Sequence, residues 1–397
     1  MKKLVILGGG AAGFMVAVRL RRSKISDMDV VLVDNKAFFE YTPALCSVLY
    51  EKTDEEFQRH FMDITFDYET TLKKMNVKFV LGSVQDLKDN QVLVATSEDE
   101  VIRIDYDYVT ICTGSSYADP WKTNDITYTL SLETRLAYLK EQRQAYLTAD
   151  SILCIGGGPV GVEVVSEISY RSPQKAITLI NSGEQVLSSA PANLGKHAQR
   201  ILEHRENIVL IMNEKAEKKA ENVYETDKTH RQIKADLVYN CIGVKPNSEF
   251  LKESHADWLD EKGYIHVERT LNVRGTDNVF AIGDINNIGE PKLYYIAHMQ
   301  ALHCVRNLSR VLSGQEMVPY HSASPAMFIS MGPHYSVGTI SGIIQLTGWP
   351  FNKNKGSKIA AWLKYIIEKV SVQGGSSIEV LMNETLYLYN NAQHVLC

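Results

Sequence analysis

Cysteine is scarce in this sequence and never occurs at a spacing that would build a metal site or a disulfide framework. The six cysteines form no CxxC or CxxxxC motif and no Cys/His pair at the spacing of zinc ligands. We therefore expect neither a metal site nor disulfide scaffolding. Cys112, Cys154 and Cys241 lie in apolar, β-rich runs, where a small buried thiol packs as a core residue and stays unreactive.

Long apolar runs and an excess of positive charge are absent as well. No stretch reaches the roughly 18 apolar residues that span a bilayer, the apolar run at residues 4–7 is too short for a signal peptide, and Lys2 excludes N-myristoylation. The 42 Lys and Arg residues are outnumbered by 47 Asp and Glu residues, so the chain has no overall attraction for nucleic acid. We expect a cytoplasmic protein without a nucleic-acid partner, and any membrane contact should be peripheral.

A glycine-rich turn, GxGxxG, follows the first predicted strand and precedes a helical pattern. In that context Gly8 permits a tight turn, Gly10 lets the backbone approach a pyrophosphate, and Gly13 lets the helix lie close to the strand. The next predicted strand, residues 30–33, ends at Asp34, whose carboxylate can bind both hydroxyls of an adenosine ribose. Strand, turn, helix and acidic strand end together predict a dinucleotide-binding site.

The same pattern recurs in the middle of the chain. Gly156, Gly158 and Gly161 follow the predicted strand at residues 151–155, and the next strand ends at Asn181. Two such sites in one chain suit an enzyme that passes hydride between two redox cofactors, although a structural, degenerate second copy is the alternative. Asn181 would not repel a 2′-phosphate, but no Arg follows it directly to attract one, so we expect NADH, with NADPH possible.

Three further segments carry a family resemblance: residues 109–114, residues 240–243, and residues 270–273 followed by 278–284. In this order they resemble the flavoproteins with two dinucleotide-binding domains, the superfamily of pyridine nucleotide-disulfide oxidoreductases. The resemblance implies an α/β fold with two Rossmann-like domains and a C-terminal α+β region. FAD would be bound by residues 1–117 and 244–318, NAD(P)H by an inserted domain at 118–243, and the C-terminal region would be 319–397.

Other segments resemble particular branches of this superfamily. Tyr41-Thr42-Pro43 resembles the stretch that lines the flavin in type II NADH dehydrogenases and sulfide:quinone reductases. Residues 291–297, 328–332 and 337–342 resemble the apoptosis-inducing factor 2 or ferroptosis suppressor group. The resemblance implies an FAD-dependent NAD(P)H:quinone oxidoreductase, in which hydride passes to FAD and two electrons then pass to a quinone or another small acceptor. Sulfide oxidation is disfavoured, because the sequence offers no obvious second cysteine to face Cys46.

The motifs and the resemblance together predict the site residues. Glu163 would lie near the nicotinamide end of NAD(P)H, Lys292 would add charge near the flavin's pyrimidine edge, and Gln300 would contact the quinone. The predicted cofactor-binding residues are Gly8, Gly10, Ala12, Gly13, Asp34, Asn35, Pro43, Val84, Thr113, Gly114, Asp284 and Ala297 for FAD, and Gly156, Gly158, Pro159, Gly161, Glu163, Asn181 and Gly243 for NAD(P)H.

Two other functions stay open at this stage. A flavin-dependent disulfide or peroxide reductase would use Cys46, which lies among Ala44, Leu45, Val48 and Leu49 with no basic neighbour to stabilise a thiolate. A redox-signalling flavoprotein would bind NADH with little turnover.

The C-terminal region contains an amphipathic helix near residues 357–371. Its apolar residues recur at helical spacing from Ile359 to Val370, and Lys353, Lys355 and Lys358 precede or begin it. Such a helix docks on its own protein, on a second copy in a homodimer, or on a lipid surface. In the tail beyond it, residues 386–389 alternate Leu and Tyr and could form an extra strand.

Overall fold

A computed structural model describes residues 1–23, 25, 28–96, 100–123, 125–322, 326–340, 344–347 and 354–395. These residues form an α/β fold with parallel sheets, as the sequence predicts. Two strand-turn-helix units of Rossmann type are present, one beginning at each glycine-rich turn.

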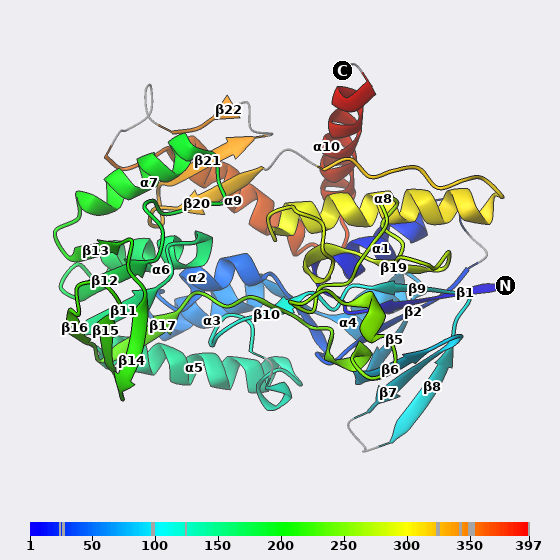
Figure 1. The fold of residues 1–397 in the computed structure, drawn as a ribbon, viewed down its shortest axis with the longest axis horizontal. Coiled ribbons are helices and arrows are strands. Elements are labelled where there is room, and N and C mark those ends of the chain that lie inside the picture. Colours follow the sequence, from blue (N-terminus) through cyan, green and yellow to red (C-terminus); the bar gives the residue numbers. More distant parts are fainter. Residues whose placement is uncertain are drawn as a thin grey trace.

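The first unit is a five-stranded parallel sheet, whose early strands are blue and cyan on the right of Figure 1. Short runs of Val, Ile and Leu form its inner strands and are buried on both faces, as is usual for parallel strands. Helices α1 and α8 pack against each other on one face. In spatial order the sheet contains β5 (Lys78–Leu81), β2 (Met28–Asp34), β1 (Lys2–Leu7), β9 (Tyr108–Ile111) and β19 (Val279–Ala281), and the two helices span Ala11–Arg22 and Tyr294–Leu312.

The second unit is a four-stranded parallel sheet, green on the left of Figure 1. Helix α6 follows its first strand directly, as α1 does in the first unit. In spatial order the strands are β13 (Ile208–Met212), β12 (Ala176–Asn181), β11 (Ser151–Ile155) and β17 (Leu237–Asn240); the helices of this part are α5 (Leu132–Thr148), α6 (Pro159–Arg171) and α7 (Ala192–Glu203).

The two sheets share one topology. In each, the third, second, first and fourth strands in chain order lie side by side. The connections therefore leave the first strand in opposite directions, and this switch point opens a crevice at the carboxyl ends of the strands. Both glycine-rich turns lie there. Because β9 and β19 share a sheet, the first unit combines residues from 1–117 and 244–318; the exact domain boundaries remain a prediction.

Smaller elements surround the two sheets. An antiparallel sheet, β6-β7-β8, flanks the first unit and another, β14-β15-β16, flanks the second. Their bounds are β6 (Ser83–Lys88), β7 (Gln91–Ala95), β8 (Val101–Asp105), β14 (Ala216–Ala220), β15 (Val223–Thr226) and β16 (Gln232–Lys234). The remaining pairs are β3 (Phe38–Glu40) with β4 (Thr65–Asp67) and β10 (Ser115–Ser116) with β18 (Lys245–Pro246), and the short helices are α2 (Leu45–Val48), α3 (Asp54–Asp63) and α4 (Tyr68–Lys74).

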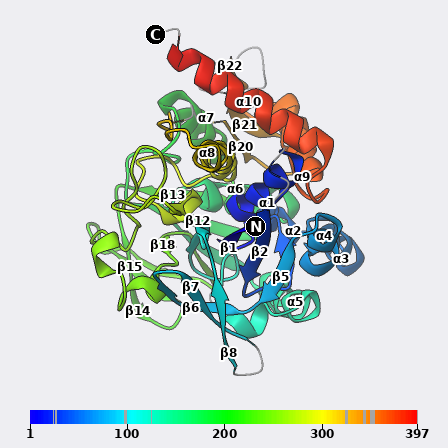
Figure 2. The ribbon, with the colours of Figure 1, turned by 90° about the vertical axis from the view of Figure 1, so that its right-hand side faces the viewer.

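The C-terminal region adds a three-stranded antiparallel sheet and two helices, orange and red in Figures 1 and 2. The predicted amphipathic helix is present as α9 (Lys358–Ser371), although Lys353 lies outside the described residues. The strands are β20 (Met327–Ser330), β21 (Ser336–Ile340) and β22 (Ile344–Gln345).

The expected strand at residues 386–389 is wrong, because these residues lie inside α10 (Ser377–Val395). The buried residues of this helix recur at helical spacing, at Val380, Asn383, Tyr387 and Asn390. Polar contacts to α8 hold that face: Tyr387 Oη lies 2.8 Å from His303 Nδ1, and Asn390 Nδ2 donates to Tyr295 Oη at 2.8 Å. The Leu-Tyr alternation is too short to override this pattern.

Candidate functional site

The first glycine-rich turn has the geometry that its motif predicts. Gly8 has a φ of +97°, and a Cβ there would lie 2.5 Å from the carbonyl oxygen of Cys112. A Cβ on Gly13 would lie 1.9 Å from the oxygen of Gly8, so neither position accepts a side chain. A Cβ on Gly10 would meet nothing within 4 Å. The face at Gly10 is therefore open, as a bound pyrophosphate requires.

Asp34 lies at the carboxyl end of β2, beside this turn. Its two oxygens accept hydrogen bonds from the N–H groups of Gly9 at 2.6 Å and Lys36 at 2.8 Å. Burial raises the pKa of Asp34. Each carboxylate oxygen has a further acceptor site, so a ribose hydroxyl can still bind. Asn35, the next residue, is exposed.

The second predicted FAD motif meets the first in space. A Cβ on Gly283, whose φ is +80°, would lie 3.2 Å from the Cβ of Ala12 and 3.7 Å from the Cβ of Ala297. The structure thus brings together the starts of α1 and α8 and the turn before Asp284. These residues are far apart in the sequence and converge as the motif order predicts.

Asp284 has two partners that sequence reasoning missed. Ser115 Oγ donates to it at 2.6 Å and Lys122 Nζ at 3.2 Å. Although burial would raise the pKa of Asp284, the charge of Lys122 and these hydrogen bonds lower it, so the group is a carboxylate. No short motif contains Ser115 and Lys122, and only the fold places them beside Asp284.

The remaining residues that the sequence predicts to bind FAD lie in separate elements of the structure. Thr113 Oγ1 donates to the carbonyl of Asn247 at 2.9 Å, and Gly114 has a φ of +65°, so both belong to the crossing between the two units. Pro43 lies in the short helical turn at Thr42–Ala44, just before α2. Val84 lies in β6 beside a β-bulge. The structure shows no direct contact that assigns a role to Pro43 or Val84.

The second glycine-rich turn repeats the geometry of the first. A Cβ on Gly161 would lie 1.9 Å from the oxygen of Gly156, whose φ is +113°, whereas a Cβ on Gly158 would meet nothing within 4 Å. Pro159 is the first residue of α6. Gly243 has a φ of +84° and is exposed at the end of the neighbouring strand. This turn is open at the same place as the first one.

Asn181 occupies the position that Asp34 has in the first unit. Its Oδ1 accepts from the N–H of Gly157 at 3.1 Å, and its Nδ2 donates to the carbonyls of Gly183 and Gln185, each at 3.1 Å. Both amide hydrogens are used, so Asn181 can offer a ligand only an acceptor.

Glu163 is buried in α6, where it meets the C-terminal region. Its Oε1 accepts from the N–H of Ser330 at 2.8 Å and forms an ion pair with Lys364 of α9. Although burial disfavours the ammonium of Lys364, the charge of Glu163 raises its pKa. Sequence reasoning missed Lys364, which appeared only as a member of an amphipathic helix.

Lys292 precedes α8, and its Nζ donates to the carbonyl of Asn286 at 2.7 Å. Burial lowers its pKa, while its charge helps to lower that of Asp284. Lys292 is therefore close to the second FAD motif.

Gln300 lies one to two turns into α8 and is buried. Its oxygen accepts from Gly283 and Asn286 at 2.8 Å, and its nitrogen donates to Glu290 at 2.8 Å. These bonds tie Gln300 to the turn before Asp284. The predicted contact with a quinone is not supported by them and stays a prediction.

Cys46 lies in α2 and is buried. Burial and the nearby charge of Glu163 raise its pKa well above the ordinary value, and Lys364 only partly opposes them. The structure thus supplies a basic neighbour that the sequence did not reveal, yet the thiol form is still favoured. The close sulfur contact in the described chain is instead between Cys154 and Cys241, whose Sγ atoms are 3.5 Å apart.

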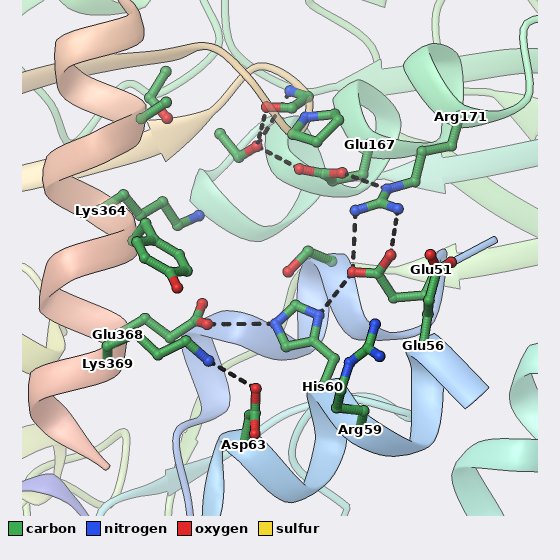
Figure 3. A pocket seen from close by; sticks show the side chains of 17 residues that line it. Glu51, Glu56, Arg59, His60, Asp63, Glu167, Arg171, Lys364, Glu368 and Lys369 are labelled. Atoms are coloured by element: carbon green, nitrogen blue, oxygen red, sulfur yellow. Dashed lines mark hydrogen bonds and ion pairs between the residues drawn. The ribbon is translucent and has the colours of Figure 1, made fainter. Parts of the chain in front are cut away.

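A charged cavity of about 370 Å³ lies between α3, α6 and α9 (Figure 3). Ten charged or titratable side chains line it, together with Ser330, Tyr365 and small residues. The ten are Glu51, Glu56, Arg59, His60, Asp63, Glu167, Arg171, Lys364, Glu368 and Lys369.

The described residues fit two dinucleotides. Neither α1 nor α6 has a side-chain cap or an acidic residue in its first turn, so their N-terminal N–H groups are available to a pyrophosphate. Helix α3, by contrast, is closed by a capping box at Thr53. No group of three or more possible metal ligands occurs within the described residues. No helix among them is both long and apolar enough to cross a membrane.

The comparisons with known proteins agree with this geometry. A family model for pyridine nucleotide-disulphide oxidoreductases matches residues 2–301. Ferroptosis suppressor protein 1 from Homo sapiens is 29% identical over 351 residues, which make up 85% of this chain and 88% of that protein. The resemblance predicted from the motifs is therefore confirmed.

Two solved structures share the fold over almost the whole chain. The sulfide:quinone oxidoreductase from Aquifex aeolicus has a TM-score of 0.75 at 18% identity, covering 96% of this chain and 94% of that one. NDH2 from Plasmodium falciparum, in complex with NADH, has a TM-score of 0.72 at 14% identity, covering 98% and 97%. With the family model matching most of its length, the chain belongs to the pyridine nucleotide-disulphide oxidoreductase family and is an NAD(P)H-dependent flavoprotein oxidoreductase.

Proposed function

We propose that this protein is an FAD-dependent NADH:quinone oxidoreductase. The observation that supports this most strongly is the pair of open glycine-rich turns, one in each parallel sheet, with Glu163 and Lys364 paired beside the second. Two facing dinucleotides allow hydride transfer from one to the other. The similarity to a sulfide:quinone oxidoreductase supports a quinone as the acceptor, and the similarity to NDH2, which was solved in complex with NADH, supports NADH as the donor.

FAD, when bound, would supply the two-electron chemistry. The turn at Gly8–Gly13 would hold its pyrophosphate, Asp34 would accept hydrogen bonds from its ribose, and the Asp284 carboxylate would bind hydroxyls of its ribityl chain. Helix α8 begins beside this motif without an acidic residue in its first turn, so its positive end favours negative charge there.

NADH would bind across the second turn. Glu163 would orient the nicotinamide end, and the ion pair with Lys364 would hold the Glu163 side chain in position. Asn181 supports NADH over NADPH, because both of its amide hydrogens are occupied and no donor remains for a 2′-phosphate. Its oxygen still accepts from a 2′-hydroxyl.

The C-terminal helices support access from a lipid surface. Helix α9 turns Lys364 and Glu368 toward the protein, while Ile359, Trp362 and Tyr365 are 52%, 60% and 54% exposed. Helix α10 likewise exposes Ile378, Leu381 and Leu388. Apolar residues with flanking lysines suit an interfacial helix, and quinones with long tails reside in lipid. A homodimer contact through the same face is the alternative, and binding to liposomes against elution as a dimer separates the two.

Anaerobic reduction followed by a panel of acceptors tests the proposed function. NADH should bleach the flavin, and a short-chain quinone should restore its colour far faster than a small disulfide or hydrogen peroxide. Faster reoxidation by disulfide or peroxide would favour the reductase that uses Cys46. Failure of all three acceptors would favour the redox-signalling flavoprotein.

A further inference from the structure

The charged cavity of Figure 3 is open to the surface and is lined by Lys364, the partner of Glu163. At its outer end it is lined by Arg59 and Asp63, which are exposed. At its inner end it is lined by Lys364, whose ammonium bonds to Glu163. Ten of its lining side chains are acidic, basic or histidine, and the volume of about 370 Å³ has room for several water molecules.

His60 stands in the wall of this cavity between two carboxylates. Its Nδ1 lies 2.8 Å from Glu51 and its Nε2 lies 3.4 Å from Glu368 of α9. Although burial disfavours the imidazolium, hydrogen bonds to both carboxylates raise the pKa of His60 to about 9. Other charged groups around it are Glu56, Arg59 and Asp63 of α3, Glu167 and Arg171 of α6, and Lys364 and Lys369 of α9.

Hydrogen bonds continue from His60 toward the redox site. Glu51 accepts from Arg171 at 2.6 Å, and Arg171 donates to Glu167 at 3.0 Å. Ser330 connects these hydrogen bonds to Glu163. Its hydroxyl donates to Glu167 at 2.6 Å, and its N–H donates to Glu163 at 2.8 Å. Hydrogen bonds of this network fix the cavity wall from the surface to Glu163.

The proposed reaction needs a proton from outside the two substrates. NADH, a quinone and one proton give NAD⁺ and a quinol, so NADH loses a hydride and the quinone gains two electrons and two protons. One of those protons must come from solvent. A quinol hydroxyl is a phenol, whose pKa of about 10 is close to that of lysine, so an ammonium can protonate a quinol oxygen as electrons arrive.

We propose that the cavity between α3, α6 and α9 is the route by which this proton enters, with His60 taking it from solvent and Lys364 delivering it. An N–H bond of Lys364 breaks as the O–H bond of the quinol forms. The amine left on Lys364 regains a proton from cavity water, which His60 supplies and then replaces from bulk solvent. Glu368 and Glu51 hold His60 in the relay orientation. This inference rests on the proposed quinone reductase activity.

His60→Ala tests the route in the flavin-loaded protein. Flavin reduction by NADH should stay within about twofold, because no proton is taken up in that step, whereas reoxidation by quinone should slow by about tenfold or more. Added imidazole should restore the quinone step, since it fits the space left by the ring. A pH indicator in the same single turnover should show proton uptake slowed in parallel with reoxidation.

Asp54→Asn is the matched control. Asp54 also belongs to α3 and pairs with Arg143 at 3.1 Å, but it does not line the cavity. This variant should reoxidise at the wild-type rate. An equal slowing of reoxidation in both variants, or a slowing in His60→Ala that imidazole does not restore, would mean that His60 has only a structural role. Either result would overturn the proposed proton route. If wild-type protein fails to reduce quinone, the proposed function fails instead.

Discussion

The two glycine-rich turns are alike in backbone and different in how their sites are completed. Both exclude a Cβ at the first and third glycines of the motif and leave the second open. The first is completed by Asp34 from the next strand and by the convergence of Ala12, Gly283 and Ala297. The second has a neutral Asn181, and its Glu163 is completed by Lys364 from the far end of the chain.

This difference shows which part of a nucleotide site is local and which part depends on the whole fold. The turn, its strand and its helix are encoded within some 30 residues, as the motif requires. The groups that would face the reacting end of the second nucleotide come from β20 and α9, more than 150 residues away. We therefore propose that the C-terminal region contributes residues to the redox site.

The largest effect should come from the closed positions of the first turn. Gly13→Ala would place a Cβ 1.9 Å from a backbone oxygen that cannot move aside, so we expect loss of flavin and a destabilisation of several kcal/mol. Gly10→Ala should lower flavin content but leave the stability of the flavin-free protein within about 0.5 kcal/mol. Flavin absorbance and denaturant melts measure both. Equal destabilisation by the two substitutions would contradict the assignment of the open face.

Lys364→Met should remove the ion pair with Glu163 at the second site and leave the first site unchanged. It leaves Glu163 buried without its counter-ion, which typically costs about 3–5 kcal/mol when the pair is fully buried. We expect full flavin content and reduction by NADH slowed by about tenfold or more. Lys369→Met, on the same helix but paired with the half-exposed Asp63, is the control and should reduce normally. Unchanged bleaching by NADH in Lys364→Met would show that α9 has no role in the second nucleotide site.

A smaller, pH-dependent effect is expected at Glu379 in α10. Both carboxyl oxygens of Glu379 are buried, and this burial raises its pKa to about 8, although the Gly375 N–H and the charge of Arg22 oppose the shift. The folded protein keeps this proton between about pH 4.5 and 8 while the unfolded chain loses it, so stability falls as pH rises through that range. Glu379→Gln should remove this part of the fall. Parallel Tm curves for both proteins from pH 5 to 8 would show that the group titrates normally.

Cys46→Ser should have the smallest effect. The thiol is buried with a raised pKa, and in the proposed reaction the flavin itself would carry the electrons to the quinone. NADH:quinone turnover should stay within a few-fold of wild type. Loss of turnover with flavin retained would favour a flavin-dependent reductase that uses Cys46.

The sequence predicts the features that neighbouring residues determine, but it does not predict contacts between residues far apart in the chain. The six motif glycines, Asp34 and the strands around them follow from patterns with a physical cause, and the structure places them as predicted. Lys364, Ser115 and Lys122 carry no local signal, because each gains its partner only through the fold. The alternation of four residues predicts a strand in the tail, whereas contacts with α8 fix a helix of 19 residues.

The proposed function depends on FAD binding at the first turn and NADH binding at the second. Stopped-flow bleaching of the flavin in Gly161→Ala tests it directly, because a Cβ there would lie 1.9 Å from the oxygen of Gly156 and displace α6 from its strand. We predict a yellow protein that a chemical reductant bleaches normally, while bleaching by NADH needs about a hundredfold more nucleotide. Bleaching by NADH at the wild-type rate and concentration would contradict the placement of NADH in the second unit.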